Sequence, residues 1–430
     1  VTSNSGSVSF DRSVYPVPFA TNELHQGNDS TDIATSGNVT MTVTVEDADF
    51  TDDTLTTGST TTAGTVVIML VEGSTTSTIL TAGSIAAYDN TGAGSQVQEL
   101  GPLSEVERDT SIYEIEFTVD KQQHSDNGMR TVQSGDVIQV KYTDASDDGG
   151  SSSDVYDSST FDLRTGSLSV DKDVYVLGSD MVVTLTDADL NLDSGSIESY
   201  TMALIEWDSD ASSSSALNGS DFTNNPSEIQ ETGEDTGVFQ TVTTIPEANV
   251  ASTAIDFGEA VTLTYADQGL AGEDSVGDDS LDVEAYFSIS NFGALVELDK
   301  AVYNWTDTVY VTITAPDHNT NTAAEETIGT TALPIQATSR AGKMCTSSTG
   351  STSYTASESG PDTGVFTNEI ALTGYNLTTA HNNPGSTTNV CDLSDDEAGK
   401  LAMAGQTDGV SVSYEYNDGS VVVASASVSF

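Results

Sequence analysis

One phrase occurs three times in this chain: SVSFDRSVY at Ser7–Tyr15, SLSVDKDVY at Ser167–Tyr175 and LVELDKAVY at Leu295–Tyr303. Each copy alternates apolar and polar residues, as a strand with one buried face does, and then runs through Asp and a base to Val-Tyr. The aspartates lie 160 and 128 residues apart, which is about the length of one domain. The repetition therefore predicts a tandem array of similar β-domains.

Three more phrases recur in the same order in each unit: a strand running into acids, an E-x-G-x-D-T-G-V-F turn, and a strand ending in Tyr-x-Asp. The first is Val39–Phe50, Val182–Asp193 and Val309–Asn319; the second is Glu105–Tyr113 (degraded), Glu231–Phe239 and Glu358–Phe366; the third is Val137–Asp144, Val261–Asp267 and Val412–Asp418. Short alternating strands between Gly, Asp and Ser turns are typical of a β-sandwich. The sequence predicts an all-β chain of tandem immunoglobulin-like β-sandwich domains.

The repeats set the expected domain boundaries. We expect domains at residues 1–166, with loop insertions, at 167–293 and at 294–426. The final SVSF at Ser427–Phe430 matches Ser7–Phe10 letter for letter, which predicts that 427–430 is the first strand of a following repeat in a longer polypeptide. The linkers are very short, so we expect a semi-rigid rod or bent arm.

Acidic residues dominate the charge: 67 Asp and Glu face 11 Lys and Arg, a formal net charge of −56 over 430 residues. Nucleic acid is excluded as a partner because its phosphates would be repelled, whereas cations are attracted. No apolar run approaches the roughly 18 residues of a membrane span, and Val1–Phe10 lacks the regions of a signal peptide. We expect a mature or truncated extracellular chain.

The motifs D-[RK]-x-V-Y, D-A-D-x-N, E-x-G-x-D-T-G-V-F and Y-x-D, with the opening VSFDRSVYPVPF, resemble the surface-layer proteins of ammonia-oxidising archaea. The resemblance covers all three units. It implies self-assembly with other copies of the chain into a porous lattice on the cell surface, dependence on divalent cations, and ammonium as the cation of interest. The first unit departs from the pattern at Glu107 and Ser111, where the others have glycine.

Acidic clusters at strand ends are candidate divalent-cation sites, with calcium the expected ion. Calcium takes about 6–8 oxygen ligands, and Asp-x-Asp-x-Asn spacing supplies several from one turn. The candidates are Asp187, Asp189, Asn191 and Asp193; Asp47, Asp49, Asp52 and Asp53; Asp317, in an expectedly weaker site; Glu231 with Asp235; Glu358 with Asp362; and Asp144 and Asp267. For each cluster the alternative is structural, because Asp also caps turns through its own backbone.

The repeated Asp11, Asp171 and Asp299 lie at domain junctions. They could hold an inter-domain ion, but we favour an ion pair with the neighbouring base or backbone capping. Cys345 and Cys391 could remain thiols, although an exported chain favours a disulfide between them. Five sequons mark candidate glycosylation sites at Asn28, Asn38, Asn218, Asn304 and Asn376.

No catalytic motif accompanies the four isolated histidines, and acidic clusters repeated in every unit indicate structure, so we do not expect an enzyme. The first hypothesis is a surface-layer protein whose negative lattice enriches cations. The alternative is a monomeric acidic adhesin or stalk, and a third possibility is that the acidity is an adaptation to high salt.

Overall fold

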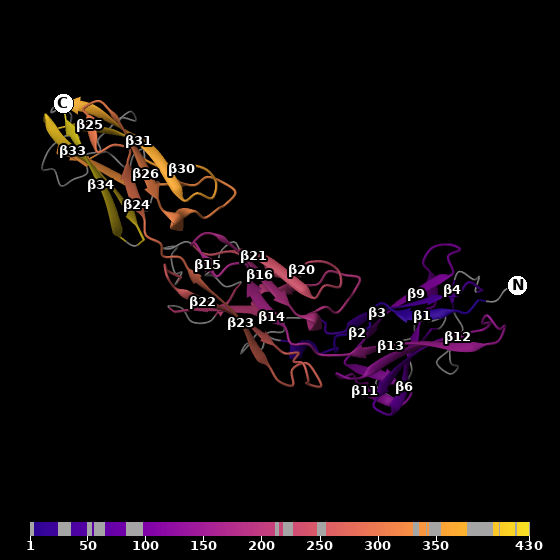
Figure 1. Ribbon diagram of the computed structural model, residues 1–430. Coiled ribbons are helices and arrows are strands. Elements are labelled where there is room, and N and C mark those ends of the chain that lie inside the picture. Colours follow the sequence, from indigo (N-terminus) through magenta and orange to yellow (C-terminus); the bar gives the residue numbers. More distant parts are fainter. Residues whose placement is uncertain are drawn as a thin grey trace.

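The computed structural model describes residues 4–24, 36–49, 54–55, 65–82, 98–210, 215–217, 227–246, 255–329, 335–340, 342–343, 354–375, 399–403, 405–417 and 419–429. Three β-sandwiches follow one another in a row, and the two chain ends lie at opposite ends of the array (Figure 1). The chain consists of tandem immunoglobulin-like domains. Among the described residues, no helix is long and apolar enough to cross a membrane.

Each copy of the repeated phrase forms two short strands in the two different sheets of its sandwich. In the first domain β1 (Ser7–Phe10) pairs antiparallel with β3 (Val39–Glu46), and β2 (Val14–Tyr15) pairs parallel with β13 (Ser153–Phe161). The chain crosses between the sheets at Asp11. This split explains why the phrase consists of two apolar segments separated by a polar turn.

The first domain has a five-stranded and a six-stranded sheet, with an additional hairpin. The five-stranded sheet has the order β1, β3, β9 (Ile112–Val119), β8 (Leu103–Glu105), β4 (Thr54–Leu55). The other has the order β2, β13, β12 (Val137–Asp144), β5 (Val66–Glu72), β6 (Thr75–Ala82), β7 (Gln98–Leu100). The hairpin β10 (Gln122–Ser125) and β11 (Gly128–Thr131) lies between β9 and β12 in sequence, and the short η1 helix spans Thr21–Glu23.

The second domain has two five-stranded sheets. One has the order β14 (Ser167–Val170), β16 (Asp180–Thr186), β21 (Val238–Thr244), β20 (Glu228–Glu231), β17 (Ser199–Thr201). The other has the order β15 (Val174–Tyr175), β23 (Leu281–Ile289), β22 (Ala260–Asp267), β18 (Ile205–Ser209), β19 (Ser215–Ala216). Single-turn 3₁₀ helices η2 (Ala188–Leu190) and η3 (Met202–Leu204) complete it.

The third domain repeats this plan. One sheet has the order β24 (Leu295–Leu298), β26 (Thr308–Thr314), β31 (Val365–Tyr375), β30 (Ala356–Glu358), β27 (Thr327–Ile328), with β32 (Lys400–Met403) also paired to β31. The other has the order β25 (Val302–Asn304), β34 (Ser420–Ser429), β33 (Thr407–Tyr416), β28 (Ile335–Ser339), β29 (Gly342–Lys343). The 3₁₀ helix η4 spans Pro316–His318.

The prediction that residues 427–430 begin a fourth repeat is wrong, because residues 427–429 belong to the end of β34. Ser427 and Val428 pair with Val302 and Tyr303 of the same domain, as Thr160 and Phe161 pair with β2. Residues 427–429 therefore complete the third sandwich, and their match to Ser7–Phe10 reflects only that both segments alternate along a sheet.

A second correction concerns the Tyr-x-Asp strand of the third domain. Tyr142 pairs with Val66, Tyr265 with Ile205 and Tyr414 with Ile335. Tyr414, rather than Tyr416 of the Tyr-x-Asp phrase, therefore takes the place of the other two tyrosines.

The apolar core is divided unequally. One cluster of buried side chains runs through the first two domains, and it includes Leu163 of the connecting segment and Leu190 and Leu192 beyond it. A separate cluster fills the third domain. The first two sandwiches are thus packed together through apolar side chains.

Candidate functional site

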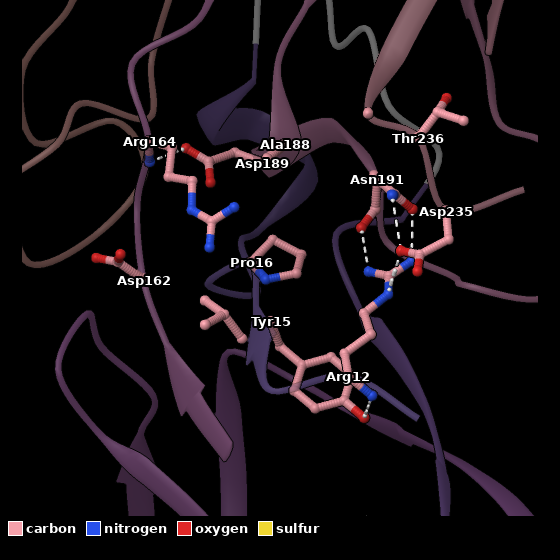
Figure 2. Close-up of a pocket in the computed structure, with 12 residues that line it drawn as sticks. Arg12, Tyr15, Pro16, Asp162, Arg164, Ala188, Asp189, Asn191, Asp235 and Thr236 are labelled. Atoms are coloured by element: carbon pink, nitrogen blue, oxygen red, sulfur yellow. Dashed lines mark hydrogen bonds and ion pairs between the residues drawn. The ribbon is translucent and has the colours of Figure 1, made fainter. Parts of the chain in front are cut away.

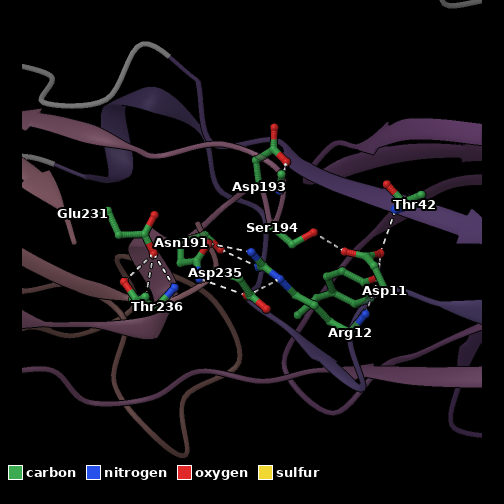
Figure 3. A network of polar contacts seen from close by, with 12 residues as sticks. Asp11, Arg12, Thr42, Asn191, Asp193, Ser194, Glu231, Asp235 and Thr236 are labelled. Atoms are coloured by element: carbon green, nitrogen blue, oxygen red, sulfur yellow. Dashed lines mark hydrogen bonds and ion pairs between the residues drawn. The ribbon is translucent and has the colours of Figure 1, made fainter. Parts of the chain in front are cut away.

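We define the first joint as residues 162–166 and the side chains that meet around them, and the second joint as residues 290–294 with their surroundings. The first joint is closed by Arg12 (Figure 3). Its guanidinium donates to the carbonyl oxygen of Asn191 (2.8 Å) and to Asn191 Oδ1 (2.6 Å), and Nε lies 2.7 Å from Asp235 Oδ1. Only 7% of the Arg12 side chain is exposed. The Asp235 side chain is 50% exposed, so salt screens this ion pair in part, whereas the two hydrogen bonds to Asn191 depend less on salt.

Three further hydrogen bonds cross the first joint from separate elements. The Ser194 hydroxyl donates to Asp11, the Thr40 amide donates to the Leu192 carbonyl (2.8 Å), and the Ser134 amide donates to the Asp274 carbonyl (2.9 Å). Contacts at three separate positions oppose both bending and rotation of one domain against the other.

A cavity of about 130 Å³ lies beside Arg12 in the first joint (Figure 2). Its walls include Tyr15 and Pro16 from the first domain, Arg164 from the linker, and Asp189 and Asp235 from the second domain. The cavity is polar and of mixed charge, and it is lined by both domains.

Three carboxyl groups are buried next to this joint. Asp187, Asp189 and Asp267 are 2%, 4% and 0% exposed. Asp189 and Asp267 accept hydrogen bonds from backbone amides of the linker, those of Arg164 (2.9 Å) and Gly166 (2.7 Å). The end of β16 and the end of β22 thus hold the incoming chain through carboxylates.

Burial and mutual repulsion alter the ionisation of this cluster. Burial and then Asp267 raise the pKa of Asp187, and burial and then Asp187 raise the pKa of Asp189. Burial also raises the pKa of Asp267. Oδ1 of Asp189 is buried with no hydrogen-bond partner. The cluster therefore favours a bound proton or cation.

The other predicted members of this cluster lie apart from it. Asn191 binds Arg12, and Asp193 Oδ1 accepts from the amide of Gly195 (2.9 Å) within its own turn. Within the described part of the chain, no group of three or more His, Cys, Asp and Glu side chains forms a ready metal centre.

The first domain has a counterpart in which the acids are hydrogen-bonded. Asp47 accepts from the Tyr142 hydroxyl (2.5 Å) and the Asp49 amide (2.9 Å), and Asp144 accepts from the amides of Gly6 (2.8 Å) and Ser146 (2.7 Å). Asp52 and Asp53 lie outside the described residues.

The third domain keeps one acid of the cluster. Ala315 holds the place of Asp187, so the buried Tyr414 hydroxyl has no hydrogen-bond partner. Asp317 accepts from the Asn417 amide (2.8 Å) at Oδ2, and its buried Oδ1 has no partner. The cluster of the third domain therefore contains fewer carboxyl groups than the cluster of the second domain.

The glutamate of each E-x-G-x-D-T-G-V-F phrase anchors its turn. Glu231 Oε1 accepts from the amides of Thr236 and Gly237 (both 2.7 Å), and Glu358 Oε1 accepts in the same way from Thr363 (2.8 Å) and Gly364 (2.7 Å). Asp235 faces Arg12 instead (Figure 3). Glu231 and Asp235 are therefore not brought together as one ligand set.

The junction aspartates Asp11, Asp171 and Asp299 cap the backbone, which was one of the two roles favoured from the sequence. Asp171 Oδ1 accepts from the Tyr175 hydroxyl (2.5 Å) and the Val182 amide (2.7 Å), and Asp11 and Asp299 have the same arrangement. The neighbouring bases lie elsewhere: Arg12 pairs with Asp235, Lys300 with Asp307, and Lys172 lies over the Tyr175 ring.

The modification candidates are only partly described. Asn38 is half-buried and Asn304 is exposed. Cys345, Cys391, Asn28, Asn218 and Asn376 lie outside the described residues.

Sequence reasoning missed the inter-domain role of Arg12. The signal was available in part, since Arg12 is the one arginine among the three copies of the phrase and Asn191 and Asp235 stand in repeated motifs. Their proximity depends on how two domains pack, which the repeats do not reveal.

No family model matches, and no curated protein matches. The Escherichia coli adhesin FdeC is 13% identical over 100% of this chain and 98% of that chain, with a TM-score of 0.22. A tetra-tandem repeat of a large adhesion protein is 16% identical over 91% and 82%, with a TM-score of 0.21. The Dpr2–DIP-Theta immunoglobulin complex is 8% identical over 98% and 99%, with a TM-score of 0.22.

Proposed function

We propose that this chain is an extended, non-catalytic stalk of immunoglobulin-like domains in an extracellular surface protein. The closed first joint is the observation that carries the proposal. An ion pair of the buried Arg12 side chain, hydrogen bonds from several elements and a shared apolar core hold two domains in one orientation, as a spacer that keeps a fixed reach requires. Strong negative charge keeps such a surface soluble and hydrated.

The orientation of the first two domains tests this function. Nitroxide labels at the exposed Tyr156 and Val242, attached through a non-canonical amino acid, report the distance between the domains. We expect one narrow distance distribution in the wild type and a broader one in Arg12→Ala. A broad distribution in the wild type would overturn the stalk proposal, and Lys300→Ala serves as the matched control.

We also propose that a divalent cation, calcium by its preference for carboxylates, binds at Asp187, Asp189 and Asp267. The buried Asp189 Oδ1 without a partner and the raised pKa values support it, because a cation would relieve the repulsion of the buried charges. Calcium at pH 8 should raise the melting temperature of the wild type relative to chelator. Asp189→Asn should abolish this shift, whereas a shift that persists in Asp189→Asn would rule the site out.

A surface-layer lattice is the second candidate. Apolar side chains on the outer faces of the last strands favour contacts between copies: Tyr156 on β13, Tyr286 on β23, and Val421 and Val423 on β34 are all more than half exposed. If copies assemble through them, electron microscopy of concentrated protein should show a periodic sheet, and combined substitution of these residues by serine should remove it. Isolated rods in both samples would exclude the lattice.

A further inference from the structure

The second joint carries counterparts of the polar groups that dock in the first joint. Asn319 and Asp362 of the third domain hold the places of Asn191 and Asp235, and Asn319 Nδ2 donates to Asp362 Oδ1 (2.9 Å) as Asn191 does to Asp235 (3.3 Å). Lys172 holds the place of Arg12 in the repeated phrase. Its ammonium lies over the ring of Tyr175, 5.6 Å from the centroid.

One buried acceptor of the third domain lacks the donor that its counterpart has in the first joint. Asn319 Oδ1 is unpaired, whereas Asn191 Oδ1 accepts from Arg12. Asp317 and Asp189 each leave Oδ1 unpaired, and they differ at Oδ2, which accepts from the linker amide of Arg164 in Asp189 but from the Asn417 side chain in Asp317. A buried acceptor without a donor destabilises the fold, because it has lost its hydrogen bonds to water. The unpaired Asn319 Oδ1 thus belongs to a residue whose counterpart in the first joint, Asn191, binds a side chain of the preceding domain.

The linkers allow the same arrangement. Residues 162–166 join β13 to β14, and residues 290–294 join β23 to β24, so both linkers have five residues. Asp171 corresponds to Asp11, and Thr322 offers a hydroxyl where Ser194 donates to Asp11. Donors and acceptors for a docked second joint are therefore present on both sides of it.

The second joint has polar residues at three places where the first joint buries leucine. Thr320 stands where Leu192 is buried, His318 where Leu190 is buried, and Asn291 where Leu163 is buried. The third domain instead touches the linker through Asn417, whose amide donates to Asn291 Oδ1 (3.1 Å) and to the Phe292 carbonyl (3.2 Å). Loss of buried apolar area weakens docking without removing its polar groups.

We propose that the Asn319–Asp362 pair is a docking site for a cationic side chain, and that its ligand is Lys172 of the same chain. The second joint then exchanges between the open form described here and a closed form that reproduces the first joint. This proposal deepens the stalk function and rests on it, because it gives the stalk one fixed joint and one that can close.

Substitution Lys172→Arg tests the proposal, because a guanidinium binds such an Asn–Asp pair through several donors at once. Labels at the exposed Val242 and Tyr310 report the distance between the second and third domains. We expect Lys172→Arg to increase a short, narrow distance population about threefold or more over the wild type. The double variant Lys172→Arg/Asp362→Asn should return to the wild-type distribution.

Two controls make the outcome decisive. The Tyr156–Val242 distance of the first joint is measured in each variant, so that loss of the stalk arrangement is distinguished from failure of the second joint to close. Dilution with unlabelled protein shows whether the short population lies within one chain. Identical distributions in Lys172→Arg and the double variant, or a short population that disappears on dilution, would overturn the proposal.

Discussion

Ser111 occupies a backbone conformation that the other two units give to glycine. Its φ is 59°, and Gly237 and Gly364 have the same value. The amide of each residue donates to the glutamate that anchors its turn, Glu105 in the case of Ser111 (2.9 Å). The departure seen in the sequence therefore leaves the turn intact but at a steric cost, since a Cβ disfavours this region.

Replacement of Ser111 by glycine should stabilise the first domain. Relief of the left-handed conformation gives about 1–2 kcal/mol, and the greater freedom of unfolded glycine removes part of it, leaving about 0.5–1 kcal/mol. Urea denaturation measures the change. The reverse substitution Gly237→Ser should destabilise, because its Cβ would lie 3.2 Å from Ala188 Cα. A destabilised Ser111→Gly would show that Ser111 is held by contacts of its own.

Tyr265 and Tyr414 occupy equivalent positions, and only Tyr265 has a buried hydrogen bond. Comparing them therefore measures the contribution of that bond to stability. The Tyr265 hydroxyl donates to Asp187 (2.6 Å), whereas the Tyr414 hydroxyl has no partner because Ala315 replaces that aspartate. Tyr265→Phe should cost about 1.5–3 kcal/mol, and Tyr414→Phe should be neutral or slightly stabilising. Equal effects on the free energy of unfolding would contradict this difference.

At the scale of elements, two glutamates lie together at the edge between β17 and β20, where the amide of Glu198 donates to Glu231 Oε2 (3.4 Å). Burial and the hydrogen bond with Glu231 raise the pKa of Glu198. Burial acts against ionisation of Glu231 too, but the bond from Glu198 and the amides of Gly237 and Thr236 hold its pKa below the usual range. Glu326 and Glu358 repeat this arrangement in the third domain.

The raised pKa of Glu198 predicts a loss of stability with increasing pH. The folded state binds this proton more tightly than the unfolded state, so the contribution is complete below about pH 4 and disappears as pH rises through the folded pKa. The free energy of unfolding should therefore fall by about 1 kcal/mol less in Glu198→Gln than in the wild type when the pH is raised from 5 to 9. This figure allows for the partial exposure of Glu198. Urea denaturation at both pH values measures this, with the exposed Glu234→Gln as control. If the free energy of unfolding of the wild type and of Glu198→Gln depended on pH in the same way, the raised pKa of Glu198 would be contradicted.

At the scale of the whole molecule, the two joints differ in how strongly they couple the unfolding of the domains that they connect. Packed apolar side chains and the Arg12 ion pair connect the first two domains, while the third has its own core. Cooperativity in unfolding follows such contacts, because an interface that is lost with one domain destabilises the other.

Calorimetry should therefore show the first two domains unfolding in one transition and the third in another. Arg12→Ala removes two hydrogen bonds to Asn191 and an ion pair to the half-exposed Asp235, and it should cost about 1–3 kcal/mol and divide the first transition into two. Three independent transitions in the wild type would contradict the coupling of the first joint.

The repeats by themselves determined the fold class, because alternation of period two and the order of motifs express local strand geometry and its turns. For the junction aspartates they left an ion pair with the neighbouring base and backbone capping open, and the structure shows the capping. The place of 427–429 and of Tyr414 was decided by strand pairing, which joins residues far apart in the chain. Only the tertiary structure showed that Arg12 reaches Asn191 and that Asp187, Asp189 and Asp267 lie together at a joint. The physical reason is that such contacts depend on the packing of two domains and on the burial of charge. The local pattern of residues predicts neither.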